Sequence, residues 1–299
     1  NPHKHWDFPS SLYSLITLAS LVLAIKSLAN NWPVCAAAGV VFACGALAFA
    51  RRQARLSDPL LTFDIFRSRI FSGGALTAGG AMFCLAGLEL LSTQKLQLVD
   101  ALSPLNAGLI ISAMALSAIP TSILGGATLH HVGFLPLISG GFLFMAAGMA
   151  LVVWTGGTML PLLVCGLVLT GLGAGLAMSV SSTAIINAAP PHRAGMASGV
   201  EAVSYEFGTL LSIALTGSLV PLLMARELPP HLSELGTDAL HHHSSHAAAT
   251  SAYNAGYLFT IGGLSCFALL FAAITAWCFR DNPKSGDPHA AHQQKDRSP

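Results

Sequence analysis

The amino-acid sequence predicts an all-α polytopic membrane protein with about eight transmembrane helices. Only 9% of its 299 residues are charged, against about 25% in ordinary soluble domains, and 53% are hydrophobic. A helix needs about 20 mostly apolar residues to cross ~30 Å of hydrocarbon. Eight stretches meet this requirement: 10–29, 33–50, 70–92, 105–127, 133–154, 159–186, 195–223 and 253–279. These stretches are too long and too continuously apolar to be the alternating strands of a membrane β-barrel.

The connections divide the chain into four parts. We predict two transmembrane helices in 1–50, and a basic cytoplasmic loop in 51–69 with a short interfacial helix at "LLTFDIF". A six-helix bundle is predicted in 70–279 and a disordered cytoplasmic tail in 280–299. The chain opens at Asn1 without a signal peptide, so we expect it to be part of a longer protein.

The positively charged residues predict the orientation, because Lys and Arg are enriched in the short cytoplasmic connections of membrane proteins. If the amino terminus is cytoplasmic, all but three of the 14 Lys and Arg residues lie on that side; the three are Lys26, Lys95 and Arg226. We therefore expect both ends of the chain in the cytoplasm, with the helices in the cell inner or plasma membrane. The charge is not gathered into a basic patch, so no nucleic acid is expected as a partner.

Acidic residues within the seventh stretch are the strongest indication of function. A charged side chain at the centre of a membrane costs roughly 2.5–3.5 kcal/mol on insertion scales, and such residues usually face a cavity or an ion pathway. With a rise of 1.5 Å per residue from Gly195, Glu201 lies about 9 Å and Glu206 about 16 Å along the helix. The two carboxylates are about 140° apart around its axis, so they could line adjacent walls of one cavity.

Tyr205 lies four residues after Glu201, on the same face, where its hydroxyl could donate a hydrogen bond to that carboxylate. Burial favours the neutral acid whereas a bound cation favours the ionised form, so such a group can exchange a proton for a cationic substrate. The alternatives are a protonated carboxyl that only supports packing, or a Glu201 that reaches toward Arg193 or the interface. Glu89, a third intramembrane acid, could act in transport or could be solvated near the outer face.

Five further residues are candidates for packing or gating. Gly171 and Gly175 lie in "GLGAG", and small residues of this kind let neighbouring helices approach closely or slide on one another. Gly195 opens the seventh helix and Gly208 lies within it. Arg193, in the turn before this helix, could clamp a neighbouring carbonyl or carboxylate, or could serve as a positive-inside anchor.

No enzyme motif, metal-ligand spacing or disulfide pattern is present. The six cysteines are scattered singly within apolar stretches. The sequence contains no GxSxG, HExxH, P-loop or glycine-rich dinucleotide turn. The histidines of "HHHSSH" (241–246) favour a solvated loop, with a metal site of a metal-dependent enzyme as the alternative. We expect no metal and no cofactor, with the proton as the coupling ion.

Several segments resemble one family of transporters. The residues "HWDFPSSLYSLITLASLVLAIK", "FARRQARLSDPLLTFDIFRSRIF", "QKLQLVDALSPLNAGLIISAMAL" and "APPHRAGMASGVEAVSYEFGTLLSIALTGSL" are similar to successive segments of the fourteen-span drug:proton antiporters of the EmrB/QacA type. These antiporters belong to the major facilitator superfamily, and "GGATLHHVG" looks like a degraded form of its cytoplasmic loop motif. The resemblance covers residues from about 5 to 280 and implies the carboxy-terminal portion of such a protein.

The resemblance implies that the eight helices are helices seven to fourteen, of which the first two are extras between two six-helix halves. It also implies that acids of the thirteenth helix, here Glu201 and Glu206, act in proton coupling and in recognition of cations. Ala202 stands where some relatives carry a second adjacent acid, and Ser112-Ala113 replaces a usual "LP". These departures leave the substrate range open.

The sequence therefore predicts a proton-coupled efflux transporter of lipophilic or quaternary cations in a lipid bilayer, present as a fragment that lacks its amino-terminal half. A major facilitator carrier of a different small solute is one alternative. A non-transporting membrane sensor or assembly protein is an alternative of another class. We expect no transport by residues 1–299 alone, because alternating access requires two bundles that move against each other.

Overall fold

The computed structural model describes residues 8–27, 31–55, 63–228 and 246–280. Within these ranges eight helices are long and apolar enough to cross a membrane, so the predicted all-α membrane fold is confirmed. The long helices are α1 (Phe8–Ser27), α2 (Trp32–Gln53), α3 (Arg69–Leu98), α4 (Pro104–Val132), α5 (Phe134–Trp154), α6 (Leu160–Ala188), α7 (Ala194–Glu227) and α9 (His246–Phe279); two short 3-10 helices are η1 (Phe63–Arg67) and η2 (Pro191–Arg193).

Each predicted stretch overlaps one of these helices, and several helices continue beyond it. Helix α3 extends to Leu98 rather than ending near residue 92, and α9 begins at His246 rather than near residue 253. The hydropathy pattern marks only the part of a helix that needs an apolar environment. Polar residues at the ends continue the backbone hydrogen-bond ladder without adding to that pattern.

Side chains next to the helix starts explain several boundaries. Asn31, Ser68 and Ser103 each cap a helix by accepting a hydrogen bond from a backbone N–H three residues later, at 3.3, 3.4 and 3.3 Å. Gly133 separates α4 from α5 and has a φ of +87°, which a residue with a Cβ rarely adopts. These local signals produce short turns, and short turns make consecutive helices antiparallel.

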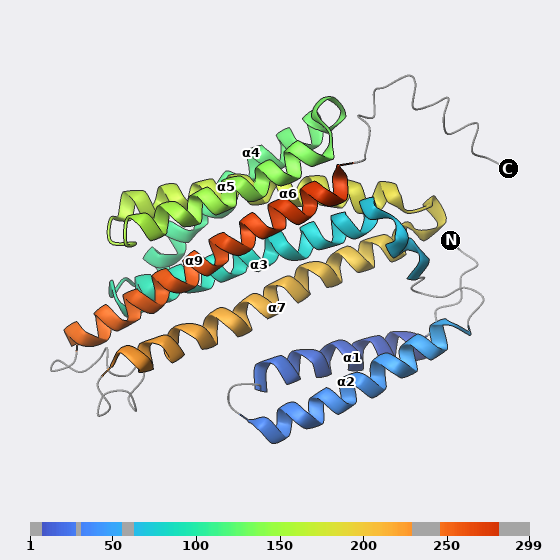
Figure 1. Ribbon diagram of the computed structural model, residues 1–299, viewed down its shortest axis with the longest axis horizontal. Helices are drawn as coiled ribbons and strands as arrows, with labels where there is room; N and C mark the ends of the chain where they lie inside the picture. The colour runs from blue at the N-terminus through green and yellow to red at the C-terminus, as the bar shows by residue number, and fades with distance from the viewer. Residues whose placement is uncertain (1–7, 28–30, 56–62, 229–245, 281–299) are drawn as a thin grey trace.

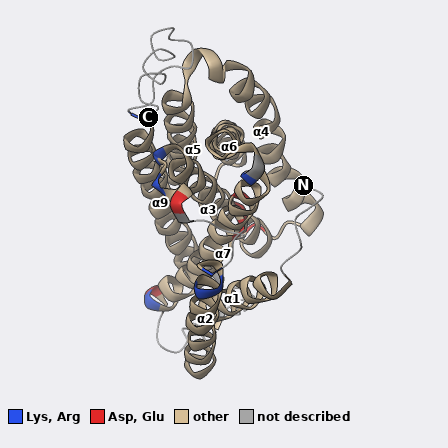
Figure 2. Cartoon of the chain, turned by 90° about the vertical axis from the view of Figure 1, so that its right-hand side faces the viewer, with Lys and Arg blue, Asp and Glu red and all other residues tan. Residues whose placement is uncertain are grey.

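The helices alternate in direction, so α1 begins and α9 ends at the same end of the molecule (Figure 1). Helix α3 lies between α7 and α9 and is the most buried of the spanning helices. Helices α1 and α2 pack on each other as a hairpin beside α7. The ribbon seen end-on carries few charged residues (Figure 2).

Some predicted features lie wholly or partly outside the described residues. They include residues 56–62 of the basic loop, the histidines 241–243 and the tail from residue 281 onward. The short helix predicted around "LLTFDIF" is present as η1, in the part of that segment that the structure describes.

Glycines of α6 bring three helices into backbone contact. A Cβ at Gly171 or Gly175 would overlap the carbonyl oxygens of Met114 and Ala118 in α4, and a Cβ at Gly173 would overlap that of Gly141 in α5. Helix α6 is therefore packed backbone to backbone against both α4 and α5. The close approach predicted for Gly171 and Gly175 is confirmed.

We predict that Gly171→Ala destabilises the bundle by about 1–3 kcal/mol, the usual cost of overpacking a well-packed interior. The new methyl group would meet the Met114 carbonyl and the Ser117 hydroxyl, which belong to a helix that must then move away. Thermal unfolding of the purified protein in detergent measures the effect. Gly126→Ala is the control, since a Cβ at Gly126 meets nothing within 4 Å. Equal losses in both variants would contradict the packing argument.

Candidate functional site

Helix α7 carries the two candidate acids and lies against α3 near its middle. A Cβ at Gly208 would overlap the carbonyl of Gly79 in α3, and the carbonyl of Ser204 lies 3.1 Å from where a Cβ at Gly79 would be. The absence of a side chain at both glycines lets the two backbones touch. The acids lie within two turns of this contact, so the contact fixes their position along the axis of α3.

Glu201 and Tyr205 form a hydrogen-bonded pair on α7. The Tyr205 hydroxyl donates to Oε1 of Glu201 at 2.9 Å, which confirms the contact predicted from their spacing. Both side chains are partly buried. The Tyr205 ring packs on a cluster that includes Phe71, Ala78 and Ile185, contributed by α3 and α6. The bundle therefore holds the tyrosine, and the tyrosine in turn orients the carboxyl group.

Glu206 has a different environment from Glu201. Its side chain is exposed at the surface of this chain, and no described residue forms a hydrogen bond or an ion pair with it. Glu206 precedes Gly208 by two residues, about 200° around the helix, so it faces away from α3. The structure thus brings Glu201 and Tyr205 together and leaves Glu206 on another face of α7. Glu89 is likewise exposed, on α3, with no hydrogen-bond or ion-pair partner among the described residues.

Arg193 forms an ion pair with Asp64, with Nη1 and Oδ2 at 3.1 Å. This contact joins η2, before α7, to η1, before α3. Of the two hypotheses for Arg193, it matches the one in which the side chain holds a neighbouring carboxylate. Ile65 of η1 packs into the same buried cluster as Ala197 of α7. A Cβ at Gly195 would meet nothing within 4 Å, so close packing does not explain a glycine there.

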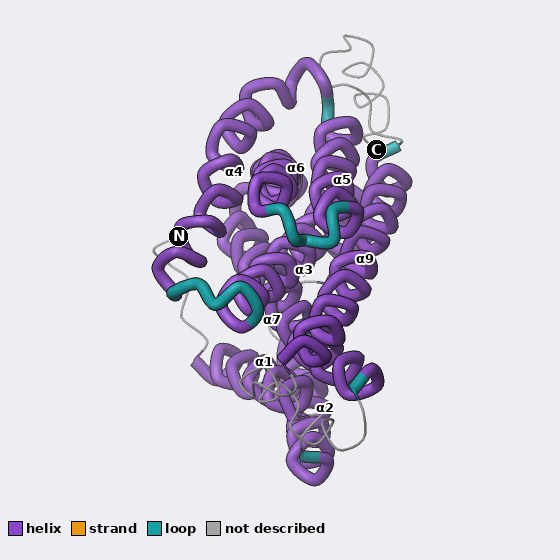
Figure 3. Tube along the Cα trace, turned by 90° about the vertical axis from the view of Figure 1, so that its left-hand side faces the viewer, coloured by secondary structure: helices purple, strands orange, loops and turns teal. Residues whose placement is uncertain are grey.

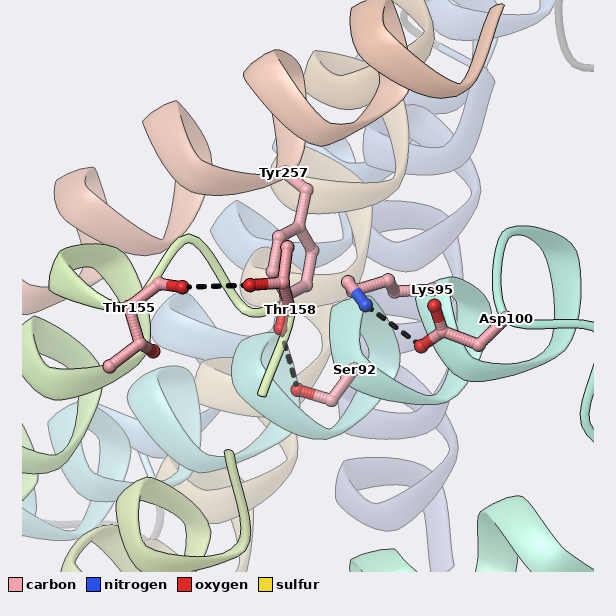
Figure 4. Close-up of polar contacts among 6 residues, drawn as sticks. All are labelled: Ser92, Lys95, Asp100, Thr155, Thr158 and Tyr257. Carbon is pink, nitrogen blue, oxygen red and sulfur yellow. Dashed lines mark hydrogen bonds and ion pairs between the residues drawn. The ribbon is translucent and has the colours of Figure 1, made fainter. Parts of the chain in front are cut away.

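Lys95 is buried, although it lies near the end of α3. Its Nζ lies 2.8 Å from Oδ2 of Asp100, and the exposed fractions of the two side chains are 3% and 37%. Next to this pair the hydroxyls of Ser92 and Tyr257 lie 3.5 Å apart (Figure 4). The sequence signal for this cluster was a lysine and an aspartate five residues apart across the end of a helix.

An apolar groove of about 250 Å³ opens between α3, α7 and α9. Four phenylalanines line it: Phe83, Phe207, Phe267 and Phe271. Ser204 also lines the groove, and its hydroxyl donates to the Val200 carbonyl at 2.8 Å. The groove was not predicted, because its walls come from helices that are distant in sequence.

No group of three or more His, Cys, Asp or Glu residues that could hold a metal ion is found within the described ranges. The histidine cluster at 241–246 cannot be placed, since its first residues and the side chain of His246 lie outside those ranges.

Comparison with known proteins identifies the family. The profile of the family described as "Sugar (and other) transporter" matches residues 67–220, which is just over half of the chain. The chain belongs to this family of membrane transporters in the major facilitator superfamily.

Two curated relatives and one solved structure illustrate the similarity. It is 26% identical to the multidrug resistance protein Stp of Mycobacterium tuberculosis, over 80% of this chain and 45% of the relative. It is 32% identical to the methyl viologen resistance protein SmvA of Salmonella typhimurium, over 58% of this chain and 35% of the relative. The chain spans about half the length of the curated relatives it matches, or less.

The solved structure is a bacterial homologue of the human lysosomal transporter Spinster, in an inward-facing and unoccupied conformation. It matches with a TM-score of 0.54 at 19% identity, over 83% of this chain and 60% of that one. At this identity the match supports the fold alone, and the fold is that of a major facilitator transporter.

We predict that the Arg193–Asp64 pair stabilises this end of the bundle only modestly. Both side chains are partly exposed, at 33% and 60%, and exposed pairs contribute about 0.2–1 kcal/mol. A double-mutant cycle with Asp64→Asn and Arg193→Gln, followed by thermal unfolding, measures the coupling. A coupling that does not weaken at high salt would contradict an exposed pair.

Proposed function

We propose that the chain is the carboxy-terminal part of a proton-coupled efflux transporter that exports lipophilic or quaternary cations. The observation that carries the proposal is Glu206, a carboxyl without a hydrogen-bond partner among the described residues, about 18 Å along a membrane-spanning helix. A group of this kind is too unfavourable in hydrocarbon to be retained without a role, and it marks a substrate or ion pathway.

The relatives support the class of substrate. One is named for multidrug resistance and another for resistance to methyl viologen, an aromatic compound with two positive charges. A carboxylate balances the charge of such a cation, and a bound cation in turn favours the ionised carboxylate. The spanning helices described here offer no Arg or Lys at mid-depth, as an anionic substrate would require.

The coupling follows from competition at one group. Glu206 holds a proton or balances a cationic substrate, and it cannot do both at once. When the site opens to the outside, protonation releases the cation; when it opens to the inside, loss of the proton restores the charge that binds the next cation. A proton gradient can therefore drive the cation outward. Glu201 contributes a second carboxyl on the same helix, oriented by Tyr205.

We further propose that Glu206 faces a second helical bundle, which this chain does not include. The chain spans about half the length of its curated relatives, and Glu206 and much of α4 lie at its surface. The substrate would lie between the two bundles. On this proposal residues 1–299 alone do not transport, and no enzymatic activity, metal or organic cofactor is involved.

The orientation proposed is that both ends of the chain lie in the cytoplasm, with the helices in the inner or plasma membrane. Most described basic residues belong to the end of the bundle where α1 begins and α9 ends: Arg51, Arg52, Arg55, Arg67, Arg69, Arg193 and Arg280. Only Lys95 and Arg226 belong to the opposite end among residues with described side chains. The positive-inside rule assigns the end that is richer in Lys and Arg to the cytoplasm.

We predict that Glu206→Gln in the full-length transporter abolishes proton-driven efflux of a quaternary cation, because the amide can neither lose a proton nor balance a charge. Efflux from proteoliposomes with an imposed pH gradient measures this, with protein content checked by immunoblot. Glu227→Gln, an exposed acid at the end of the same helix, is the matched control and should retain transport. Wild-type efflux by Glu206→Gln would overturn the assignment.

We predict that Tyr205→Phe lowers efflux roughly 10-fold, because a hydrogen bond to a charged group contributes about 1.5–3 kcal/mol. Since Tyr205 acts through Glu201, the double variant Tyr205→Phe/Glu201→Gln should transport no worse than Glu201→Gln alone. The same efflux assay gives all three rates. Additive losses in the double variant would mean that Tyr205 has a separate role.

A further inference from the structure

The turn between α3 and α4 contains a strained residue. Ala101 has a φ of +51°, and within the described chain it is the residue other than glycine with a positive φ. The Cβ of an L-residue disfavours this left-handed conformation because it approaches the following carbonyl oxygen. Such strain persists only where the surroundings hold it, and it is found at switch regions.

The residues on both sides of Ala101 are tied back to α3. The backbone N–H of Asp100 donates to the Lys95 carbonyl at 3.1 Å, and that of Leu102 donates to the Leu96 carbonyl at 2.9 Å. The Asp100 carboxylate also pairs with the Lys95 ammonium group at 2.8 Å. Ala101 is therefore held in its strained conformation by contacts on either side of it.

The end of α3 is in turn held by two other elements. The Lys95 side chain is buried beside Gly157 of the α5–α6 turn, where a Cβ would lie 3.5 Å from its Cε and 3.0 Å from the Tyr257 ring of α9. Close to it, the Tyr257 and Ser92 hydroxyls lie 3.5 Å apart (Figure 4). The turns that follow α3 and α5 are at the same end of the bundle (Figure 3). Lys95 is thus part of a rigid support for the turn.

Beyond Ala101, helix α4 has one main packing partner. It is among the least buried spanning helices, and its main neighbour is α6. Part of this contact consists of α4 carbonyls on Gly171 and Gly175, where no α6 side chain intervenes; at Gly125 of α4, by contrast, a Cβ would lie within 3.4 Å of α6 side chains. In the described part of the chain, the Ser117 hydroxyl to the Val168 carbonyl, at 3.0 Å, is the side-chain hydrogen bond between these helices.

We propose that the α3–α4 turn is a latched hinge, in which the Lys95–Asp100 pair holds Ala101 strained and release of the pair lets α4 rotate against α6. Relief of the strain at Ala101 offsets part of the work of separating the ion pair. The pair can separate because Asp100 is 37% exposed and so reaches water at the end of the bundle. The purpose of the hinge, a change in the position of α4 during transport, rests on the proposed carrier function.

The hinge can be tested by electron–electron spin-resonance distances in the full-length transporter. Spin labels at Leu105, in the first turn of α4, and at Trp154, at the end of α5, report the position of α4, since both residues are exposed, at 72% and 83%. The native cysteines are first replaced. The measurement uses liposomes without substrate or a proton gradient, so its outcome is independent of whether Glu206 couples protons to cations.

We predict two distances between the labels at Leu105 and Trp154. One belongs to the latched state, in which the Lys95–Asp100 pair is formed, and the other to the released state, in which it is broken; the latched state should predominate. Asp100→Asn removes the pair and should lower the ratio of latched to released protein at least 10-fold, whereas Asp100→Glu should keep it near wild type. Ala101→Gly removes the strain and should raise the latched ratio about fivefold. Glu227→Gln, a charge removal at the same end of the bundle, is the control and should change nothing.

A single distance that is the same in all variants would overturn the hinge, as would a shift of Ala101→Gly toward the released distance. If Asp100→Asn does not fold, Ala101→Gly still decides, because it is expected to raise thermal stability as well as the latched ratio. An Ala101→Gly protein that is less stable than wild type would contradict the strain on which the proposal rests.

Discussion

The rest of this structure depends on one constraint, which is that backbone polar groups within hydrocarbon must be satisfied by the protein itself. This requirement leaves helices as the spanning elements, and lipid tails remove most of the hydrophobic force that would press helices together. Close contact then has to come from surfaces that fit. Glycines provide those surfaces where α6 touches α4 and α5 and where Gly208 of α7 touches Gly79 of α3. Against such a background each charged side chain within a span is an exception that requires a cause.

Three of the charged side chains in the bundle show how differently that exception is met. Glu201 is oriented by a tyrosine on its own helix, and Lys95 is compensated by an aspartate just beyond its helix. Glu206 has no hydrogen-bond or ion-pair partner among the described residues and lies at the chain surface. The first two arrangements are complete within this chain. The third is complete only if another group, proton or cation meets it, and for this reason the functional proposal rests on Glu206.

The sequence was sufficient for features that depend on local periodicity. Eight spans follow from apolar length, and the Tyr205–Glu201 contact follows from a spacing of four residues in a helix. It was not sufficient where the chain reverses or where distant segments meet. The Lys95–Asp100 pair depends on the conformation of a turn, and the Arg193–Asp64 pair joins residues 129 positions apart. The walls of the apolar groove come from three helices, so the groove could not be predicted until the relative positions of those helices were known.

The two ion pairs also make the ends of the bundle unequal. Arg193 and Asp64 are both partly exposed, so water can replace their contact at little cost and salt screens it. Lys95 is buried, and an ammonium group left there without Asp100 would lose its compensation in a medium that solvates it poorly. Loosening the bundle at the η1–η2 end therefore requires less work than loosening it at the α3–α4 turn. A carrier that alternates between two openings needs such an asymmetry to be offset by something that differs between its states. Ala101 lies beside the stronger Lys95–Asp100 pair, and relief of its strain when that pair separates offsets part of the extra work.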